Sequence, residues 1–359
     1  MINRINRVFK KARNGEPITV AFLGGSITQG CLSSVHETCY AYLTYDWFVK
    51  NFSSSNVTYV NAGIGGTTSQ YGVARVENHV LSKNPDMVFV EFSVNDSDID
   101  FFKETYEGLI RRIYNYECAP AIMIIHNIKY DDGVSAERIH HELAEYYKIP
   151  SVSMKSTIYK QMLDEGFHYN EITADGLHPN DKGHKMVSDI ICAKLEELLA
   201  DGEKNNFAAA DEEYDFPEQV TENLYVNSKL YQADDCTPVL NGFERDTREK
   251  KEFLDIFSKG WIGKKVGDEI VFDFDCASIS VQYKKTIKKP APICSLILDD
   301  DNEHPFILDA NFEEDWGDEL HIDNILVHGE KKKHTIKIRV DQIPDGAISD
   351  FYLVSMIVA

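Results

Sequence analysis

The sequence lacks the cysteine spacing, the long apolar runs and the basic surface that would place it in several common functional classes. Its seven cysteines are scattered, odd in number and contain no CxxC pair. This argues against a zinc site and a disulfide framework, so we expect free thiols in a reducing compartment. Lysine and arginine total 37 against 59 aspartate and glutamate residues, which gives a formal net charge of -22. Because this charge repels phosphate groups, we expect neither nucleic acid nor a membrane among the partners.

Long apolar segments are also missing. No run approaches the roughly 20 residues that a membrane-spanning helix needs, and the basic N-terminus, residues 1–19, has no apolar core of the length a signal peptide needs. With the expected free thiols, this predicts a cytoplasmic protein. The 359 residues suffice for one large domain or two ordinary ones.

The first half of the chain alternates short apolar segments with amphipathic ones. The short segments are apolar on both faces, as parallel strands covered by helices are. They span residues 18–23, 57–62, 85–92, 120–127 and 149–154. Helical periodicity is clear in residues 135–147 and 181–200. The pattern predicts an α/β domain with a parallel sheet over residues 1–205.

The periodicity changes in the second half. Residues 201–213 are polar and predict a linker or a connecting helix. Beyond them, apolar residues recur at every second position, as in antiparallel strands with one wet face. This alternation is present in residues 268–276 and 332–340, and residues 277–285, 292–300 and 351–359 are three further candidate strands. We therefore predict a second domain, a β-sandwich, over residues 206–359.

Three short motifs each follow one of the first three apolar segments. LGGSITQG (23–30) permits a tight turn that exposes Ser26 at the carboxyl end of the sheet. NAGIGGTT (61–68) turns backbone N–H groups of Gly65 and Gly66 toward a ligand, and EFSVND (91–96) places the Asn95 amide in the same crevice. Taken singly, each also fits a helix cap or a turn.

A fourth motif, ADGLHPND (174–181), precedes the last helix of the first half. Asp175 and His178 are three residues apart in a turn, close enough for the carboxylate to bind one imidazole nitrogen. Pro179 restricts His178 to an extended backbone, which helps to fix the ring. A lone D-x-x-H is more often a capping arrangement.

Together the four motifs supply the groups that acyl transfer requires. Ser26 would attack an ester carbonyl, His178 would carry the proton, and Asp175 would orient the imidazole. The backbone N–H groups of Ser26 and Gly66 and the Asn95 side chain are candidate donors to the oxyanion. Four coincident motifs are much harder to explain by turns and caps than any single one.

The same motifs resemble those of the SGNH (GDSL-like) hydrolase superfamily, and the resemblance spans roughly residues 18–200. It implies that Ser26, Asp175 and His178 are catalytic and that Ser26, Gly66 and Asn95 form the oxyanion hole. It also implies a three-layer, flavodoxin-like fold with strand order 2-1-3-4-5, and no metal or organic cofactor. Two positions depart from the usual pattern: Gly25 replaces an aspartate, and Ser93 replaces a glycine.

The expected substrate class follows from the same resemblance. GGSIT is similar to the motif of carbohydrate-acting members, and a sandwich beside the hydrolase domain resembles acetylxylan esterases, some of which carry a jelly roll. We therefore expect a serine carbohydrate O-acetylesterase acting on xylan or xylo-oligosaccharides. Two alternatives stay open: a lipid esterase, lysophospholipase or thioesterase with the same triad, and a non-catalytic carbohydrate-binding protein.

The second half offers weaker signals. Trp316 lies among acidic residues, and because aromatic faces stack on sugars it is a candidate substrate-binding residue; packing between the domains is the alternative. The acidic run 299–305 lacks the glycine and final glutamate of an EF-hand, so a solvated loop is expected over a looser Ca²⁺ site. An exposed face of the sandwich would suit a glycan or a homo-oligomer contact. His140 and His141, on a predicted helix, are expected at the surface.

Overall fold

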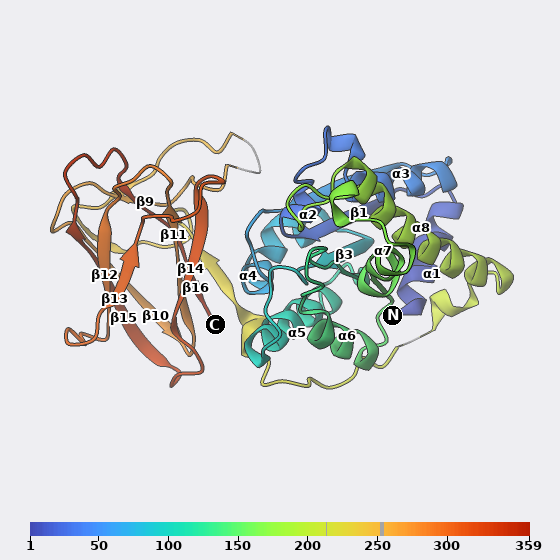
Figure 1. Cartoon of the computed structure of the whole chain (residues 1–359). Helices are drawn as coiled ribbons and strands as arrows, with labels where there is room; N and C mark the ends of the chain where they lie inside the picture. Colours follow the sequence, from blue (N-terminus) through green and yellow to red (C-terminus); the bar gives the residue numbers. More distant parts are fainter. Residues whose placement is uncertain (213, 252–254) are drawn as a thin grey trace. The chain divides into compact units, whose positions relative to one another are not determined.

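The chain forms two compact units in the computed structural model, which describes residues 1–212, 214–251 and 255–359 (Figure 1). The first unit comprises Met1–Val226 and the second Asn227–Ala359. Each has its own sheet structure and its own buried core.

The first unit is built on a five-stranded parallel sheet with the order β2-β1-β3-β4-β5. This confirms the predicted fold and strand order. The strands are β1 (Ile18–Gly24), β2 (Val57–Gly63), β3 (Met87–Glu91), β4 (Ala121–His126) and β5 (Ser151–Ser153). All residues of β3 and β4 are buried, since helices cover both faces of the sheet.

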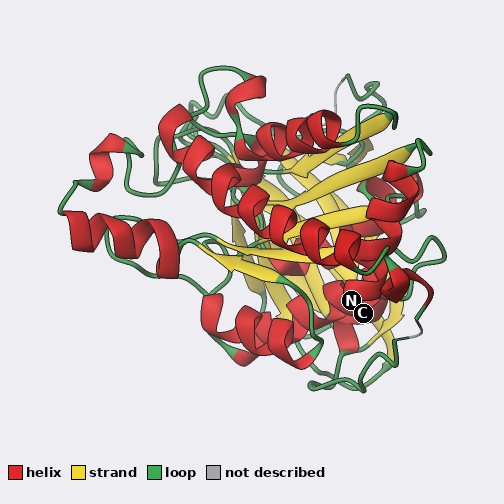
Figure 2. Ribbon diagram, turned by 90° about the vertical axis from the view of Figure 1, so that its right-hand side faces the viewer, coloured by secondary structure: helices red, strands yellow, loops and turns green. Residues whose placement is uncertain are grey.

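Among the described residues of this unit, eight α-helices surround the sheet (Figure 2). They are α1 (Ile2–Arg13), α2 (Ser26–Gln29), α3 (Tyr40–Asn51), α4 (Ser69–His79), α5 (Asp100–Tyr114), α6 (Glu137–Tyr146), α7 (Lys160–Glu165) and α8 (Asp181–Lys204). Helices α1, α3 and α8 contact one another, and α4, α5 and α6 form a second contacting group. Helix, sheet and helix are thus the three layers, and the parallel strands bring the four motifs to one edge of the sheet.

The second unit is a β-sandwich of antiparallel sheets, as predicted. One sheet has the order β13-β12-β15-β10-β7, and the other the order β14-β11-β16-β9-β8, with β6 also pairing with β16. The strands are β6 (Lys229–Tyr231), β7 (Val239–Asn241), β8 (Glu244–Arg245), β9 (Trp261–Gly263), β10 (Glu269–Cys276), β11 (Ile279–Lys285), β12 (Ile293–Leu298), β13 (Phe306–Asp309), β14 (Glu319–Leu326), β15 (Lys332–Gln342) and β16 (Phe351–Val358). The finer expectation of a jelly roll stays a prediction.

The core of the sandwich shows why period-two segments became strands. In β10, Ile270, Phe272 and Cys276 are buried, while Asp273 and Asp275 alternate with them and are not. Side chains from both sheets, including Trp261 and Leu296, meet in one hydrophobic cluster. In β10, alternation therefore assigns one face to this core, whereas all residues of β16 are buried.

The predicted boundary after residue 205 lies too early. Helix α8 ends at Lys204, but the segment that follows belongs to the first unit up to Val226. Phe216 stacks on Tyr114, with ring centroids 3.5 Å apart, and the Leu224 N–H donates to Glu104 Oε1 at 2.8 Å. The polar composition of residues 201–213 suggested a linker, whereas long-range contacts hold most of residues 206–226 on the first unit. Residue 213 lies outside the described residues.

Within the described part of the chain, no helix combines the length and the apolarity required to cross a membrane.

Candidate active site

The nucleophile candidate, Ser26, stands in a sharp turn from a strand into a short helix. β1 ends at Gly24, and Ser26 is the first residue of α2, which ends with Gly30 in the left-handed conformation at φ 100°. Because Ser26 follows the last residue of β1 so closely, the turn presents it at the carboxyl edge of the sheet. The residue is 8% exposed, so Ser26 is largely shielded from water.

His178 and Asp175 complete a hydrogen-bonded chain with Ser26. His178 Nε2 lies 2.8 Å from Ser26 Oγ, and His178 Nδ1 lies 2.6 Å from Asp175 Oδ2. With Nδ1–H donating to the carboxylate, Nε2 is free to accept the serine proton. The structure thus brings together the three residues that the sequence singled out, although 152 positions separate serine from histidine.

The local turn fixes Asp175 in its charged form. Its Oδ1 accepts hydrogen bonds from the backbone N–H groups of Leu177, at 2.9 Å, and His178, at 2.7 Å. Partial burial works to raise the pKa of Asp175, but the hydrogen bonds from the His178 side chain and from these backbone groups outweigh it and lower the pKa to about 2. Asp175 therefore remains an acceptor for His178 far below neutral pH.

Two backbone N–H groups are the candidate oxyanion donors that the sequence predicts. Those of Ser26 and Gly66 have no acceptor among the described residues. The neighbouring N–H of Gly65 instead donates to Gln29 Oε1 at 2.7 Å, which ties the glycine loop to α2. Gly66 adopts φ 69°, a conformation that favours glycine. Sequence reasoning missed Gln29, since nothing in the motif distinguishes it from an ordinary helix residue.

The Asn95 side chain fits against Gly25. A Cβ atom on Gly25 would lie only 2.3 Å from Asn95 Oδ1, so the glycine makes room for the amide. Oδ1 is buried without a partner, and Nδ2 has no acceptor among the described residues. The amide N–H group is therefore available to a ligand. This close approach explains why glycine, and not the aspartate usual in the family motif, stands at position 25 before Ser26.

A second carboxylate–imidazole pair lies behind the site. His140 Nε2 donates to Asp96 Oδ2 at 3.0 Å, and both side chains are fully buried. Asp96 Oδ1 accepts the N–H of Ser69, the first residue of α4, at 2.8 Å. The expectation that His140 is a surface residue is wrong, because its ring stacks on Tyr106 with centroids 3.6 Å apart. His141 is exposed, as predicted.

Sequence reasoning also missed Glu91, the last residue of β3. It is fully buried, with Thr28 Oγ1 3.4 Å from Oε2 and Ser93 Oγ 3.3 Å from Oε1. Burial raises the pKa of Glu91 to about 7. Ser93 Oγ also donates to the Asn127 carbonyl at 2.8 Å. The serine that replaces the usual glycine of the family motif at this position therefore adds a buried hydroxyl that has a hydrogen-bond partner. An acidic residue ending an apolar strand was the signal available.

The weaker candidates lie in the second unit. Trp316 is 56% exposed, and its Nε1 donates to Glu314 Oε2 at 2.6 Å. Its contribution to substrate binding stays a prediction. In the acidic run, Asp299 accepts from His334 Nδ1 at 2.8 Å and from the Thr335 N–H at 2.9 Å. No group of three or more potential metal ligands is placed to hold an ion in the described residues.

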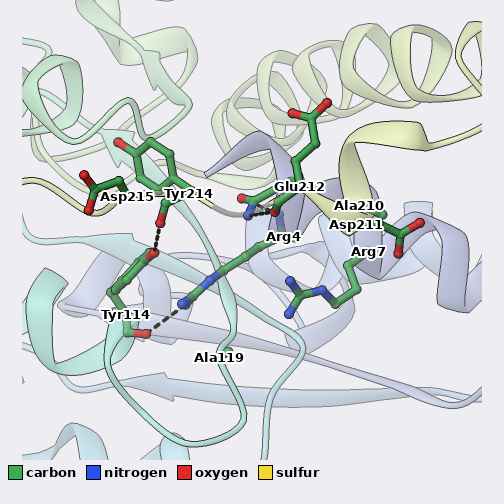
Figure 3. A pocket seen from close by; sticks show the side chains of 10 residues that line it. Arg4, Arg7, Tyr114, Ala119, Ala210, Asp211, Glu212, Tyr214 and Asp215 are labelled. Atoms are coloured by element: carbon green, nitrogen blue, oxygen red, sulfur yellow. Dashed lines mark hydrogen bonds between the residues drawn. The ribbon is translucent and has the colours of Figure 1, made fainter.

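A separate cleft in the first unit contains none of the predicted site residues (Figure 3). Arg4 and Arg7 of α1 line it together with Tyr114 and Tyr214. Arg4 Nη1 donates to the Tyr114 carbonyl at 2.8 Å. The Tyr114 hydroxyl donates to the Tyr214 carbonyl at 3.1 Å. These contacts attach the segment after α8 to the body of the unit.

Comparison with known proteins bears on the family and on the two-domain architecture. The model of the GDSL-like Lipase/Acylhydrolase family matches residues 22–186. The crystal structure of a two-domain esterase active on acetylated mannans is 45% identical, covers 100% of this chain and 95% of that chain, and has a TM-score of 0.96. The chain belongs to the GDSL-like lipase/acylhydrolase family. It is accordingly a carboxylic ester hydrolase.

Two further similarities describe how the family domain is used elsewhere. The same two-domain esterase co-crystallised with mannopentaose matches with a TM-score of 0.94, at 45% identity over 99% of this chain and 94% of that chain. Thioesterase 1/protease 1/lysophospholipase L1 of Escherichia coli K12 is 27% identical over 191 residues, 50% of this chain and 85% of that protein. The first similarity includes the sandwich, whereas the second covers only about half of this family member.

Proposed function

We propose that this GDSL-like hydrolase is a serine O-acetylesterase of carbohydrates, with Ser26, His178 and Asp175 as its catalytic residues. The observation that carries the proposal is the unbroken chain of hydrogen bonds from Asp175 through His178 to Ser26. A nucleophile, a base and an orienting acid in this order perform acyl transfer on several unrelated folds.

The reaction proceeds in two transfers of the acetyl group. Ser26 Oγ bonds to the ester carbonyl carbon while its proton passes to His178 Nε2. The tetrahedral intermediate collapses, the bond to the sugar oxygen breaks, and His178 returns the proton to that leaving oxygen. Water then attacks the acetyl-serine with the same base, which releases acetate and restores the Ser26 hydroxyl.

Three donors stabilise the negative charge of each tetrahedral intermediate. We assign them to the N–H groups of Ser26 and Gly66 and to Asn95 Nδ2, which lack acceptors among the described residues. Preorganised donors of this kind each contribute about 10²–10³ in rate. Asp175 stabilises the imidazolium that forms beside them.

Acetylated mannans are the first substrates to test. The proposal rests on the similarity over nearly the whole chain to the two-domain esterase active on them. Acetylated xylan, expected from the motifs, is the second polymer in the comparison. We further propose that Trp316 contacts the sugar chain and that the protein acts in the cytoplasm on imported oligosaccharides. A homo-oligomer stays a prediction.

The decisive experiment measures acetate release from acetylated manno-oligosaccharides and xylo-oligosaccharides beside p-nitrophenyl acetate and octanoate. We expect acetate from the sugars, fast cleavage of the acetyl ester, and a loss of about 10⁴-fold or more in kcat for Ser26→Ala. Unchanged activity of Ser26→Ala would refute the assigned nucleophile. Trp316→Ala should raise KM for oligosaccharides while leaving p-nitrophenyl acetate hydrolysis unchanged.

A lipid or thioester hydrolase is the rival enzyme, favoured by the similarity to the Escherichia coli thioesterase and lysophospholipase. It predicts preference for octanoate and no acetate from sugars. A non-catalytic carbohydrate-binding protein predicts that a fluorophosphonate leaves Ser26 unlabelled.

A further inference from the structure

Arg75 is a fully buried cation without an acidic partner. It lies in α4, is 0% exposed, and forms no ion pair with a carboxylate in the described part of the chain. Burial lowers the pKa of Arg75 to about 10, so the guanidinium remains charged at neutral pH. A buried charge with no counter-charge is unfavourable unless hydrogen bonds compensate it.

The compensating hydrogen bonds go to the ends of two strands. Arg75 Nη1 donates to the Ala62 carbonyl at 2.7 Å, and Nη2 donates to the Gly24 carbonyl at 3.1 Å. The guanidinium also lies 5.2 Å above the centre of the Tyr71 ring. Nε has no partner in the described residues, so the hydrogen bonds to the site come from the two terminal nitrogens.

These two carbonyls belong to the segments that carry the catalytic groups. Gly24 is the last residue of β1, two positions before Ser26. Ala62 is in β2, four positions before Gly66, and it pairs with Leu23 in the register of the parallel sheet. A planar guanidinium that binds both carbonyls therefore fixes the spacing between the two strand ends.

We propose that Arg75 is a positioning residue for acyl transfer, which holds the Ser26 turn and the Gly66 loop in register by bridging the Gly24 and Ala62 carbonyls. The inference rests on the proposed function, since it presumes that Ser26 is the nucleophile and Gly66 an oxyanion donor. Arg75 acts only through these backbone segments and does not touch the substrate.

The test compares Arg75→Met and Arg75→Lys with a matched control, Arg112→Met. Arg112, in α5, donates to the backbone carbonyl of Val73 in α4 at 3.0 Å and forms an ion pair with Glu77 at 2.7 Å, and neither of these partners belongs to the Ser26 turn or the Gly66 loop. Steady-state hydrolysis of p-nitrophenyl acetate gives kcat and KM, the rate of fluorophosphonate labelling reports Ser26 reactivity, and thermal unfolding reports stability.

We expect Arg75→Met to lower kcat and the labelling rate by about 10- to 100-fold, with KM changed less than about threefold, because small misplacements of reacting groups have effects of this size. Arg75→Lys keeps the charge but cannot span both carbonyls with the same planar geometry. Its kcat should therefore lie between that of the wild type and that of Arg75→Met. Arg112→Met should keep kcat within about twofold, even if its melting temperature falls.

Folded Arg75→Met with wild-type kcat would overturn the inference, as would equal losses of kcat in Arg75→Met and Arg112→Met. If Arg75→Met does not fold, Arg75→Lys decides, and a kcat within about twofold of wild type contradicts the bridging role. Wild-type protein that neither hydrolyses p-nitrophenyl acetate nor labels at Ser26 refutes the proposed function instead. The two failures are therefore distinguishable.

Discussion

At the scale of single residues, Gly25 links the Ser26 turn to Asn95, the proposed oxyanion donor. It precedes Ser26 directly, and the space that a side chain would fill is taken by the Asn95 amide. The identity of this residue therefore controls two parts of the site at once. A methyl group here must displace either the serine turn or the amide.

Gly25→Ala should consequently lower kcat by about 10²–10³, the effect of losing one oxyanion donor. The reason is steric, because the added Cβ would meet Asn95 Oδ1 at 2.3 Å. Hydrolysis of p-nitrophenyl acetate by Gly25→Ala, Asn95→Ala and the double variant forms a double-mutant cycle. In the Asn95→Ala background the glycine substitution should have little further effect; an equal effect in both backgrounds would contradict the steric account.

At the scale of secondary-structure elements, the end of β3 carries both a predicted and an unpredicted residue. Asn95 follows the strand in a recognisable motif. Glu91 belongs to the same motif, but only the structure shows that its side chain is fully buried and contacts Thr28. Short, wholly apolar segments predicted all five parallel strands, since their alternation with amphipathic helices is a local pattern. Arg75 and the burial of His140 were not predicted, because both depend on which helices pack on the strand ends.

Glu91 makes the stability of the first unit pH-dependent. Below pH 4.5 its carboxyl is protonated in both the folded and unfolded chain; between 4.5 and about 7 only the folded state keeps the proton. The contribution to stability therefore falls as pH rises through this window, by on the order of 3 kcal/mol in total.

Glu91→Gln removes this titration. Its melting temperature relative to wild type should rise between pH 4.5 and pH 7 and level off above, as measured by thermal unfolding across that range. Glu165→Gln, which alters an exposed carboxylate on α7, serves as the control. A difference between Glu91→Gln and wild type that does not vary with pH would show that Glu91 does not titrate in this window.

At the scale of the whole molecule, the first unit ends later than its last helix suggests. Glu107 in α5 is fully buried, and it accepts the N–H groups of Val220, at 2.6 Å, and Thr221, at 2.7 Å. Arg111 donates to the Pro217 carbonyl at 2.8 Å. The sequence did not predict this attachment, because residues 206–226 carry no regular periodicity and their partners are about a hundred positions away.

A fragment of residues 1–226 should therefore hydrolyse p-nitrophenyl acetate with a kcat within a few-fold of the full chain. A fragment of residues 1–205 should be less stable by several kcal/mol, since it loses the backbone donors to Glu107 and the packing of Phe216 on Tyr114. Thermal unfolding of both fragments checks this, and Glu107→Gln in the full chain shows how much of the difference depends on the charge. Equal melting temperatures for the two fragments would contradict it.

The attachment at Glu107 also has a consequence for the order of events during synthesis. A ribosome makes Glu107 more than a hundred residues before Val220 and Thr221, so the emerging chain holds this carboxylate without its native backbone donors for much of translation. Since domains generally fold as units and from the N-terminus first, the nascent hydrolase unit can close only when β6 of the next unit is about to be made. Until then, chaperones would meet a unit whose five parallel strands are all made but whose Glu107 side chain still lacks its backbone donors.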